Sequence, residues 1–292
     1  MHKFLPSIGF KSIKEKKEYD KILIDTLDHY DEKTVVMLEN NVLYGQISKR
    51  YGKGMGMSVC GEYDEEDVFH VEYAFPYFNG SSIMKQDRIL IERQAATESY
   101  AGAFDDYRIG ITLIFYLQNG MRYRRYINKG NNPKNLVTVA LSALSSEGKI
   151  LFPVQKTKSQ VLAEKEAWIH KKELIQSAKE GDEEAMESLT REDIDTCAMV
   201  SYRIQQREDV LSIVDSYFMP HGFECDQYAV LGEIMDYHHC QNLMTGEWVY
   251  QLSLNCNDMQ FDVCINEEDL FGEPAIGRRF KGLVWLQGKL QV

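Results

Sequence analysis

The sequence predicts an α+β protein, in which an antiparallel sheet with helices is joined through a helical connector to a small β domain. Short segments with strand alternation fill the first half of the chain, and strand periods return in the last hundred residues. Between them lies a stretch rich in Glu, Lys and Ala. The predicted parts are an N-terminal α+β domain at residues 1–156, a helical connector at 157–195 and a C-terminal β-rich domain at 196–292, for which a partly closed barrel is one open arrangement.

The N-terminal part begins with a predicted helix. Apolar residues recur at helical spacing over residues 12–30, and Ser12 is a suitable N-cap. The period then changes to that of strands, and we expect strands within residues 34–51, 67–78 and 87–96.

A β-hairpin is predicted at residues 108–127. Alternating apolar residues from Ile109 to Leu117 precede Asn119-Gly120, a pair that favours the positive φ angles of a type I′ turn. After it, residues 136–146 are typical of a short helix and residues 149–154 of a short strand.

The connector and the last part have clear boundary signals. Gly181 suits a helix C′ position, and Asp182 suits the N-cap of a second helix. A short helix is expected at residues 208–218, before Pro220. Four strands follow, at residues 228–241, 247–256, 259–265 and 278–292.

Composition excludes several classes of protein. Among 292 residues, 44% are hydrophobic and 27% charged, as in water-soluble globular proteins, and no apolar run could span a bilayer. The formal net charge of −12 opposes general binding to nucleic acid, which needs positive charge to displace counterions. The N-terminus lacks the features of a signal peptide. We therefore expect a cytoplasmic protein, with neither nucleic acid nor membrane as its partner.

Cofactor motifs are missing from the sequence. The six cysteines contain no C-x-x-C pair and are expected to stay reduced. The glycine-rich residues 51–61 match neither a P-loop nor a dinucleotide fingerprint, and a flexible loop or a bulged strand accounts for them. We predict no cofactor.

The stretch "DYHHCQ", residues 236–241, places two histidines beside a cysteine. If Thr245 and Gly246 form the centre of the following turn, Tyr237 faces Leu254 and His239 faces Leu252. His239 then shares an apolar face with Cys256, while His238 and Cys240 share the polar face; Cys264 is assigned to the polar face of its own strand. A zinc site needs converging ligands, so His238 and Cys240 are only weak metal candidates and an ordinary strand explains them better.

Two basic clusters are candidates for ligand binding. Arg122 and Arg124 lie with interleaved tyrosines in residues 121–134, and could contact a phosphate or stack on a base. Arg278, Arg279 and Lys281 lie beside Glu273 in a glycine-rich strand region and could hold a carboxylate or phosphate. The plainer interpretation is a solvated face for the first cluster and pairing with the acidic residues 266–273 for the second.

Three segments carry a resemblance: "FLPSIGFKSI" near the start, residues 208–234 and residues 272–288. Together they resemble an uncharacterised bacterial domain-of-unknown-function family, mostly from anaerobic Gram-positive bacteria. The resemblance runs over most of the chain, and it implies no activity, cofactor or catalytic residue.

The function suggested by these observations is binding without catalysis, either of a ligand or of a protein partner. That partner could also be a second copy of the chain in a homo-oligomer. One alternative is a hydrolase-type enzyme that assembles His238, Cys240 and a distant carboxylate in a pocket. The other is an oligonucleotide-binding β domain, which requires the five cations of the two basic clusters to form one groove.

Overall fold

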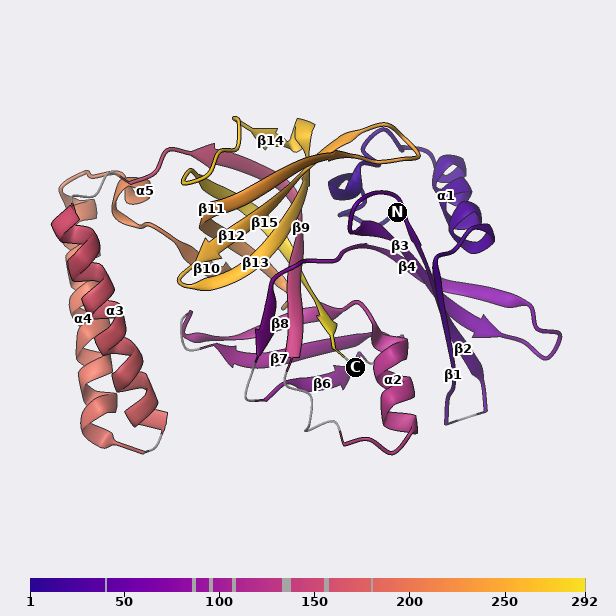
Figure 1. Cartoon of the computed structure of the whole chain (residues 1–292), viewed down its shortest axis with the longest axis horizontal. Helices are drawn as coiled ribbons and strands as arrows, with labels where there is room; N and C mark the ends of the chain where they lie inside the picture. The colour runs from indigo at the N-terminus through magenta and orange to yellow at the C-terminus, as the bar shows by residue number, and fades with distance from the viewer. Residues whose placement is uncertain are drawn as a thin grey trace. The chain divides into compact units, whose positions relative to one another are not determined.

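The computed structural model describes residues 1–39, 41–85, 88–94, 97–106, 109–132, 138–154, 158–179 and 181–291. It confirms the α+β class, with a small antiparallel sheet A and a large mixed sheet B (Figure 1). The chain divides into two compact units, one formed by residues 1–151 with 216–292 and the other by residues 152–215. This division differs from the three parts expected from the sequence, because sheet B takes strands from both ends of the chain.

Sheet A is an antiparallel sheet of four consecutive strands in the order β1-β2-β3-β4. Helix α1 (Lys16–Asp28) packs against β2 and β3 on one face of the sheet. The glycine-rich segment forms a turn and then β3, with a bulge at Cys60/Gly61, as the bulged-strand interpretation expected. A Cβ on Gly61 would lie 2.0 Å from the carbonyl oxygen of His70, so only glycine allows this approach. The strands are β1 (Glu32–Met37), β2 (Leu43–Arg50), β3 (Met55–Tyr63) and β4 (Phe69–Phe78).

Sheet B follows the order β10-β11-β12-β13-β9-β15-β8-β7-β6, and β5 and β14 pair with β9. The long strand β11 pairs with β12 over one half and with β15 over the other, so the strands curl into a partial ring. The strands are β5 (Ile83–Lys85), β6 (Leu90–Arg93), β7 (Tyr100–Asp106), β8 (Ile111–Leu117), β9 (Thr138–Leu151), β10 (Tyr217–Pro220), β11 (Gln227–Gln241), β12 (Trp248–Cys256), β13 (Met259–Asn266), β14 (Leu270–Phe271) and β15 (Arg279–Leu290). The four strands predicted in the last part of the chain are confirmed.

The predicted hairpin at residues 108–127 is wrong in its second half. Strand β8 ends at Leu117, and helix α2 (Gly120–Asn128) follows instead of a returning strand. The Asn119 side chain donates to the carbonyl oxygen of Leu290 and accepts from the Leu290 N–H, so the residue is fixed by the end of β15. Its φ of −111° is not the left-handed angle of a type I′ turn.

The predicted helix at residues 136–146 is also wrong, because the described part of this segment belongs to β9. This strand is central in sheet B, pairing with β13 and β15, and residues Val139 to Leu144 are all buried. A strand buried on both faces loses the alternation of polar and apolar residues, and a short apolar run then fits either structure.

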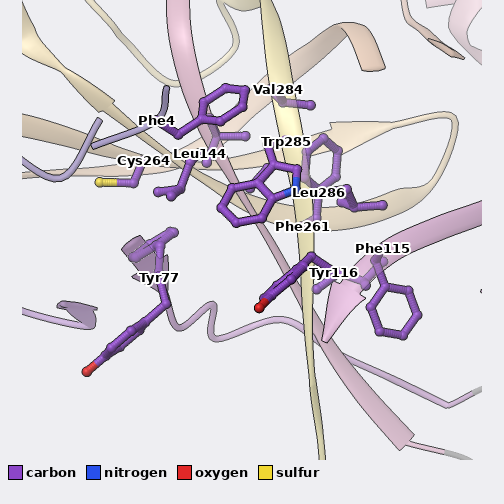
Figure 2. Packing of buried hydrophobic residues seen from close by; sticks show 14 of the residues in the cluster. Phe4, Tyr77, Phe115, Tyr116, Leu144, Phe261, Cys264, Val284, Trp285 and Leu286 are labelled. Atoms are coloured by element: carbon purple, nitrogen blue, oxygen red, sulfur yellow. The ribbon is translucent and has the colours of Figure 1, made fainter. Parts of the chain in front are cut away.

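The hydrophobic core of the larger unit surrounds β15. The Trp285 ring stacks on Phe4 at 5.6 Å between ring centroids and approaches Tyr116 at 5.1 Å. Figure 2 shows Trp285 between these rings, with Leu144 and Phe261 nearby, and Tyr77 at the margin with its hydroxyl pointing away from them. The N-terminal 3-10 helix (Pro6–Ile8) is buried against β13 and β9, so the chain start completes this core.

The second unit contains two long helices, α3 (Lys158–Lys179) and α4 (Glu183–Gln205). Gly181 has a φ of +94°, and the Asp182 carboxylate accepts from the backbone N–H groups of Glu184 and Ala185. Both predicted boundary roles are confirmed. The helix expected at residues 208–218 is shorter than predicted: α5 covers Val210–Ile213, and Tyr217 already belongs to β10.

Candidate functional site

A polar row runs along one end of the inner face of sheet A. On β2, the alternation of side chains places Gln46, Ser48 and Arg50 on the same face as Tyr44. The register brings Glu32 of β1 and Ser58 of β3 opposite Ser48. At the other end of the same face Tyr44 and its neighbour Val36 of β1 join the hydrophobic core. The face therefore changes from apolar to polar along the strands.

The polar row forms one wall of a cavity of about 300 Å³. The opposite wall comes from the end of β4, the link between β8 and α2, and the end of β15, all within the larger compact unit. The lining residues used below are Asp31, Glu32, Thr34, Gln46, Ser48, Arg50, Ser58, Tyr77, Asn79, Gln118, Arg122 and Lys289.

A buried amide network fixes the wall opposite sheet A. Gln118 Nε2 donates to the Phe78 carbonyl oxygen at 2.7 Å and to Gln287 Oε1 at 2.8 Å. Gln287 Nε2 donates to the Pro76 carbonyl oxygen, and its Oε1 also accepts from the Phe78 N–H. Strand β4 belongs to sheet A, whereas β8 and β15 belong to sheet B, and these hydrogen bonds connect the two sheets. They fix the position of the lining residue Gln118 in this wall.

Two ion pairs lie at the cavity, and both are long. Arg50 Nη2 is 3.4 Å from Asp31 Oδ1, and Arg122 Nη1 is 3.5 Å from Glu32 Oε1. The Arg50 backbone N–H also donates to Asp31 and holds the pKa of that carboxyl below its usual value. Because a guanidinium has five N–H donors, both arginines keep donors for a bound group.

Lys289 is the third cation of the cavity, and it is half-buried. Its Nζ donates to Asn79 Oδ1 at 3.3 Å, and no described carboxylate lies within ion-pair distance of it. Burial has the largest effect and lowers the pKa of Lys289 below the usual 10.5. The negative charge of Glu32 raises this pKa by less than burial lowers it, and the positive charges of Arg122 and Arg50 lower it further. A bound anion would remove this disadvantage of the charged amine.

Two polar atoms of the lining have unused hydrogen-bonding capacity. Gln118 is 5% exposed, and its Oε1 has no partner among the described residues. Thr34 is also 5% exposed, and within the described ranges no hydrogen bond involves its hydroxyl. The Gln118 oxygen itself is fully buried, whereas the Thr34 hydroxyl keeps some exposure at the cavity, so Thr34 is the group that a ligand or water can reach.

The first predicted basic cluster is divided by the structure. Arg122 lines the cavity, whereas Arg124 Nη2 donates to Glu39 Oε1 at 2.8 Å. The neighbouring Arg125 donates to the Val35 carbonyl oxygen, so these two arginines hold α2 against β1. Arg122 and Arg124 were both predicted as ligand candidates, and the geometry supports that use only for Arg122.

The second predicted cluster lies at the start of β15. Arg278 Nη1 donates to the backbone oxygen of Glu273, and Arg279 is only 7% exposed, opposite Glu233 of β11. Lys281 is exposed and faces Lys149 of β9. Helix α2, which carries Arg122 and Arg124, follows β8, and β8 pairs with the end of β15 opposite to this cluster. The structure therefore does not bring the two basic clusters together.

The "DYHHCQ" stretch lies in β11, but its register with β12 differs from the prediction. Tyr237 faces Leu252 and His239 faces Tyr250. The Asn242 side chain accepts from the N–H groups of Met244 and Thr245, which moves the centre of the turn toward the N-terminus. The shift is two residues, so each side chain keeps its predicted face.

The two histidines have different surroundings. His239 stacks between Trp248 and Tyr250, with ring centroids 4.5 and 4.4 Å away. His238 is exposed, with Nε2 3.9 Å from Asp236 Oδ2. Burial raises the pKa of the Cys240 thiol, the reverse of an activated nucleophile. Among the described residues no group of three or more His, Cys, Asp or Glu side chains is arranged to hold a metal ion.

The two other cysteines assigned to faces are both buried. Cys256 has the predicted apolar surroundings. The prediction for Cys264 is wrong, because the N-terminal segment covers that face of β13 and the thiol donates to the Ser7 carbonyl oxygen at 3.2 Å. The covering segment is more than two hundred residues away in sequence, so strand periodicity could not reveal it.

Sequence reasoning found Arg122 but missed most of the cavity, including Arg50, Gln118 and Lys289. One signal was present: the polar residues at alternate positions of "YGQISKR" end in a basic residue on the inner face of a strand. The opposite wall gave no comparable signal, because its residues are dispersed over three elements.

The fold and the cavity define an α+β protein with a curled mixed sheet and a polar site on a second sheet. The chain belongs to the family described as "Domain of unknown function, E. rectale Gene description (DUF3881)", which matches residues 5–288. This confirms the resemblance to a domain-of-unknown-function family from anaerobic Gram-positive bacteria. No curated protein and no solved structure matches the chain.

Proposed function

We propose that this protein binds a small anionic ligand in the polar cavity beside sheet A, without catalysing a reaction. The single observation that carries the proposal is Lys289, a half-buried amine in a cavity with no described carboxylate in ion-pair distance. A charged amine that has lost part of its hydration is stabilised by an anion. The cavity admits a ligand group beside it.

The remaining charges favour one anionic group rather than several. Arg50, Arg122 and Lys289 contribute three positive charges, and Asp31 and Glu32 contribute two negative charges. Helix α2 begins directly after two lining residues, so its N-terminal end adds partial positive charge to the same wall. A ligand with one phosphate or carboxylate group matches this balance.

The absence of catalysis is part of the proposal. The hydrolase alternative requires a pocket that includes His238 and Cys240, and neither residue lines this cavity. Burial raises the pKa of the Cys60, Cys240, Cys256 and Cys264 thiols, which keeps them protonated at neutral pH. Binding therefore explains the cavity with fewer assumptions than hydrolysis.

We also propose a cytoplasmic location. The five cysteines with described side chains are free, as expected for a reducing compartment. Among the described helices none is both long and apolar enough to cross a membrane. A protein partner or a homo-oligomer stays a prediction of the sequence.

The test is titration calorimetry of the full chain with inorganic phosphate at neutral pH. We expect saturable binding at one site, weakened by about tenfold or more in Lys289→Met, because a hydrogen bond to a charged group typically contributes ~1.5–3 kcal/mol. Lys281→Met is the matched control, since it removes an exposed lysine from the same strand. Equal affinity in both variants, or no binding by the wild type, would contradict the proposal.

A pH series with sulfate gives a second test, because sulfate keeps its charge over the range used. The pKa of Lys289 lies below 10.5 in the free protein, and a bound anion raises it. Affinity is therefore highest at pH values where Lys289 is protonated in the free protein. It falls as the pH rises from the lowered pKa of Lys289 in the free protein to its higher pKa in the complex. The Lys289→Met variant should lack this fall.

A further inference from the structure

The composition of the cavity wall narrows the class of ligand. Resting on the proposed function, we propose that the bound anion is a small polyhydroxylated one: a polyol or sugar with a single phosphate or carboxylate group. The anionic end lies at Lys289 and Arg122, and the hydroxyl groups face the polar row of sheet A. Volume, hydrogen-bonding pattern and the cavity's own carboxylates lead to this assignment.

The volume indicates how much of a ligand the cavity can hold, since the cavity is partly open to solvent. A cavity of about 300 Å³ has room for the volume of about ten water molecules in the liquid. A glycerol phosphate or a hexose with one anionic group is of this order. A nucleotide with its base, ribose and several phosphates would extend beyond the cavity into solvent.

The carboxylates of Asp31 and Glu32 select for donors on the ligand. A carboxylate accepts hydrogen bonds and donates none, and it repels a second anionic group. Each already contacts an arginine at 3.4 or 3.5 Å, so each keeps lone pairs free. Hydroxyl groups donate to such oxygens without adding charge.

The neutral lining has the mixed donors and acceptors that hydroxyl groups need. The Thr34 hydroxyl is unbonded within the described ranges and can donate or accept. Ser48 and Ser58 share one hydrogen bond at 2.7 Å, which leaves each oxygen further capacity.

An apolar acid would leave these groups unpaired. Its hydrocarbon part would cover the Thr34 hydroxyl and the carboxylates of Asp31 and Glu32 without offering a donor, and an unsatisfied polar group is costly once it is buried. Tyr77 provides the one aromatic side chain among the lining residues, and it is 7% exposed. The cavity wall is therefore matched to a polyol rather than to an alkyl chain.

The experiment compares glycerol phosphate with propyl phosphate by titration calorimetry on the full chain. The two compounds have the same carbon number and anionic group and differ in two hydroxyls. We expect glycerol phosphate to bind about tenfold tighter or more, on the basis of two added hydrogen bonds. Gluconate against hexanoate repeats the comparison for a carboxylate, and a preference for the hydroxylated member of either pair supports the proposal.

Thr34→Val is the matched variant, because valine keeps the shape of threonine and removes the hydroxyl. It should reduce the preference for glycerol phosphate and leave propyl phosphate affinity unchanged, whereas Lys289→Met should weaken both. Equal binding of both members in each pair would overturn this inference while leaving anion binding intact. Failure of all four compounds and of inorganic phosphate would overturn the proposed function, and this inference with it.

Discussion

The cavity beside sheet A and the "DYHHCQ" stretch of β11 differ in how their polar side chains are arranged. In β11, His238 and Cys240 lie two residues apart on one strand face, where His238 is exposed and the pKa of the Cys240 thiol is raised. In the cavity, side chains far apart in sequence converge from sheet A, α2 and β15. His238 and Cys240 share a face, but among the described residues no further His, Cys, Asp or Glu side chain converges on them to form a metal site, whereas a site needs side chains from elements that face each other.

The two regions also differ in the interactions that fix their side chains. The cavity wall is held by the network of Gln118 and Gln287, which is buried and joins three strands. His238 has one long contact with Asp236 at 3.9 Å, which is worth little between exposed groups. Three experiments test this difference, beginning with the largest expected effect.

Gln287→Ala is expected to destabilise the protein most. The change removes three buried hydrogen bonds, leaves the Phe78 N–H and the Pro76 carbonyl oxygen without these partners, and creates a void. We expect a loss of about 3 kcal/mol in the free energy of unfolding. Urea denaturation measures it, with the exposed Gln291→Ala as the control at under about 0.5 kcal/mol. A loss as small as in the control would mean that the network does not fix the wall.

His239→Ala is expected to have an intermediate effect. It removes a ring that stacks on both Trp248 and Tyr250, and aromatic pairs contribute roughly 0.5–1.5 kcal/mol each. A loss of about 1 kcal/mol in the same denaturation experiment is expected. His238→Ala, one residue away and exposed, should change stability by less than about 0.5 kcal/mol. Identical losses would contradict the assignment of the two histidines to different faces.

Metal content is expected to show the smallest effect. Elemental analysis of protein purified without added metal should give well below one zinc per chain. His238→Ala and Cys240→Ala should give the same result as the wild type, because neither residue has converging ligands among the described side chains. One zinc per chain in the wild type, lost in both variants, would make β11 a metal site and reverse the comparison.

The sequence by itself determined the elements whose signals are local. Helix α1, strands β1, β2 and β4, and the four C-terminal strands follow from periodicity, and the Gly181–Asp182 boundary follows from capping chemistry. The predicted N-cap of α1 was wrong, because the helix begins at Lys16 and is capped by Glu15, not Ser12. The faces of His238, His239 and Cys240 also follow, because side-chain alternation survives a register shift of two residues. In each case the deciding interactions lie within a few residues or one hairpin.

Only the tertiary structure decided the rest. The segment after Asn119 became α2 because the end of β15 binds the Asn119 side chain, and residues 138–151 became a central strand because β13 and β15 pair with it. The cavity depends on the same distant partners, since Lys289 and Gln118 meet the polar row of sheet A only after β15 joins β8. Such contacts span the length of the chain, and no local pattern of residues encodes them.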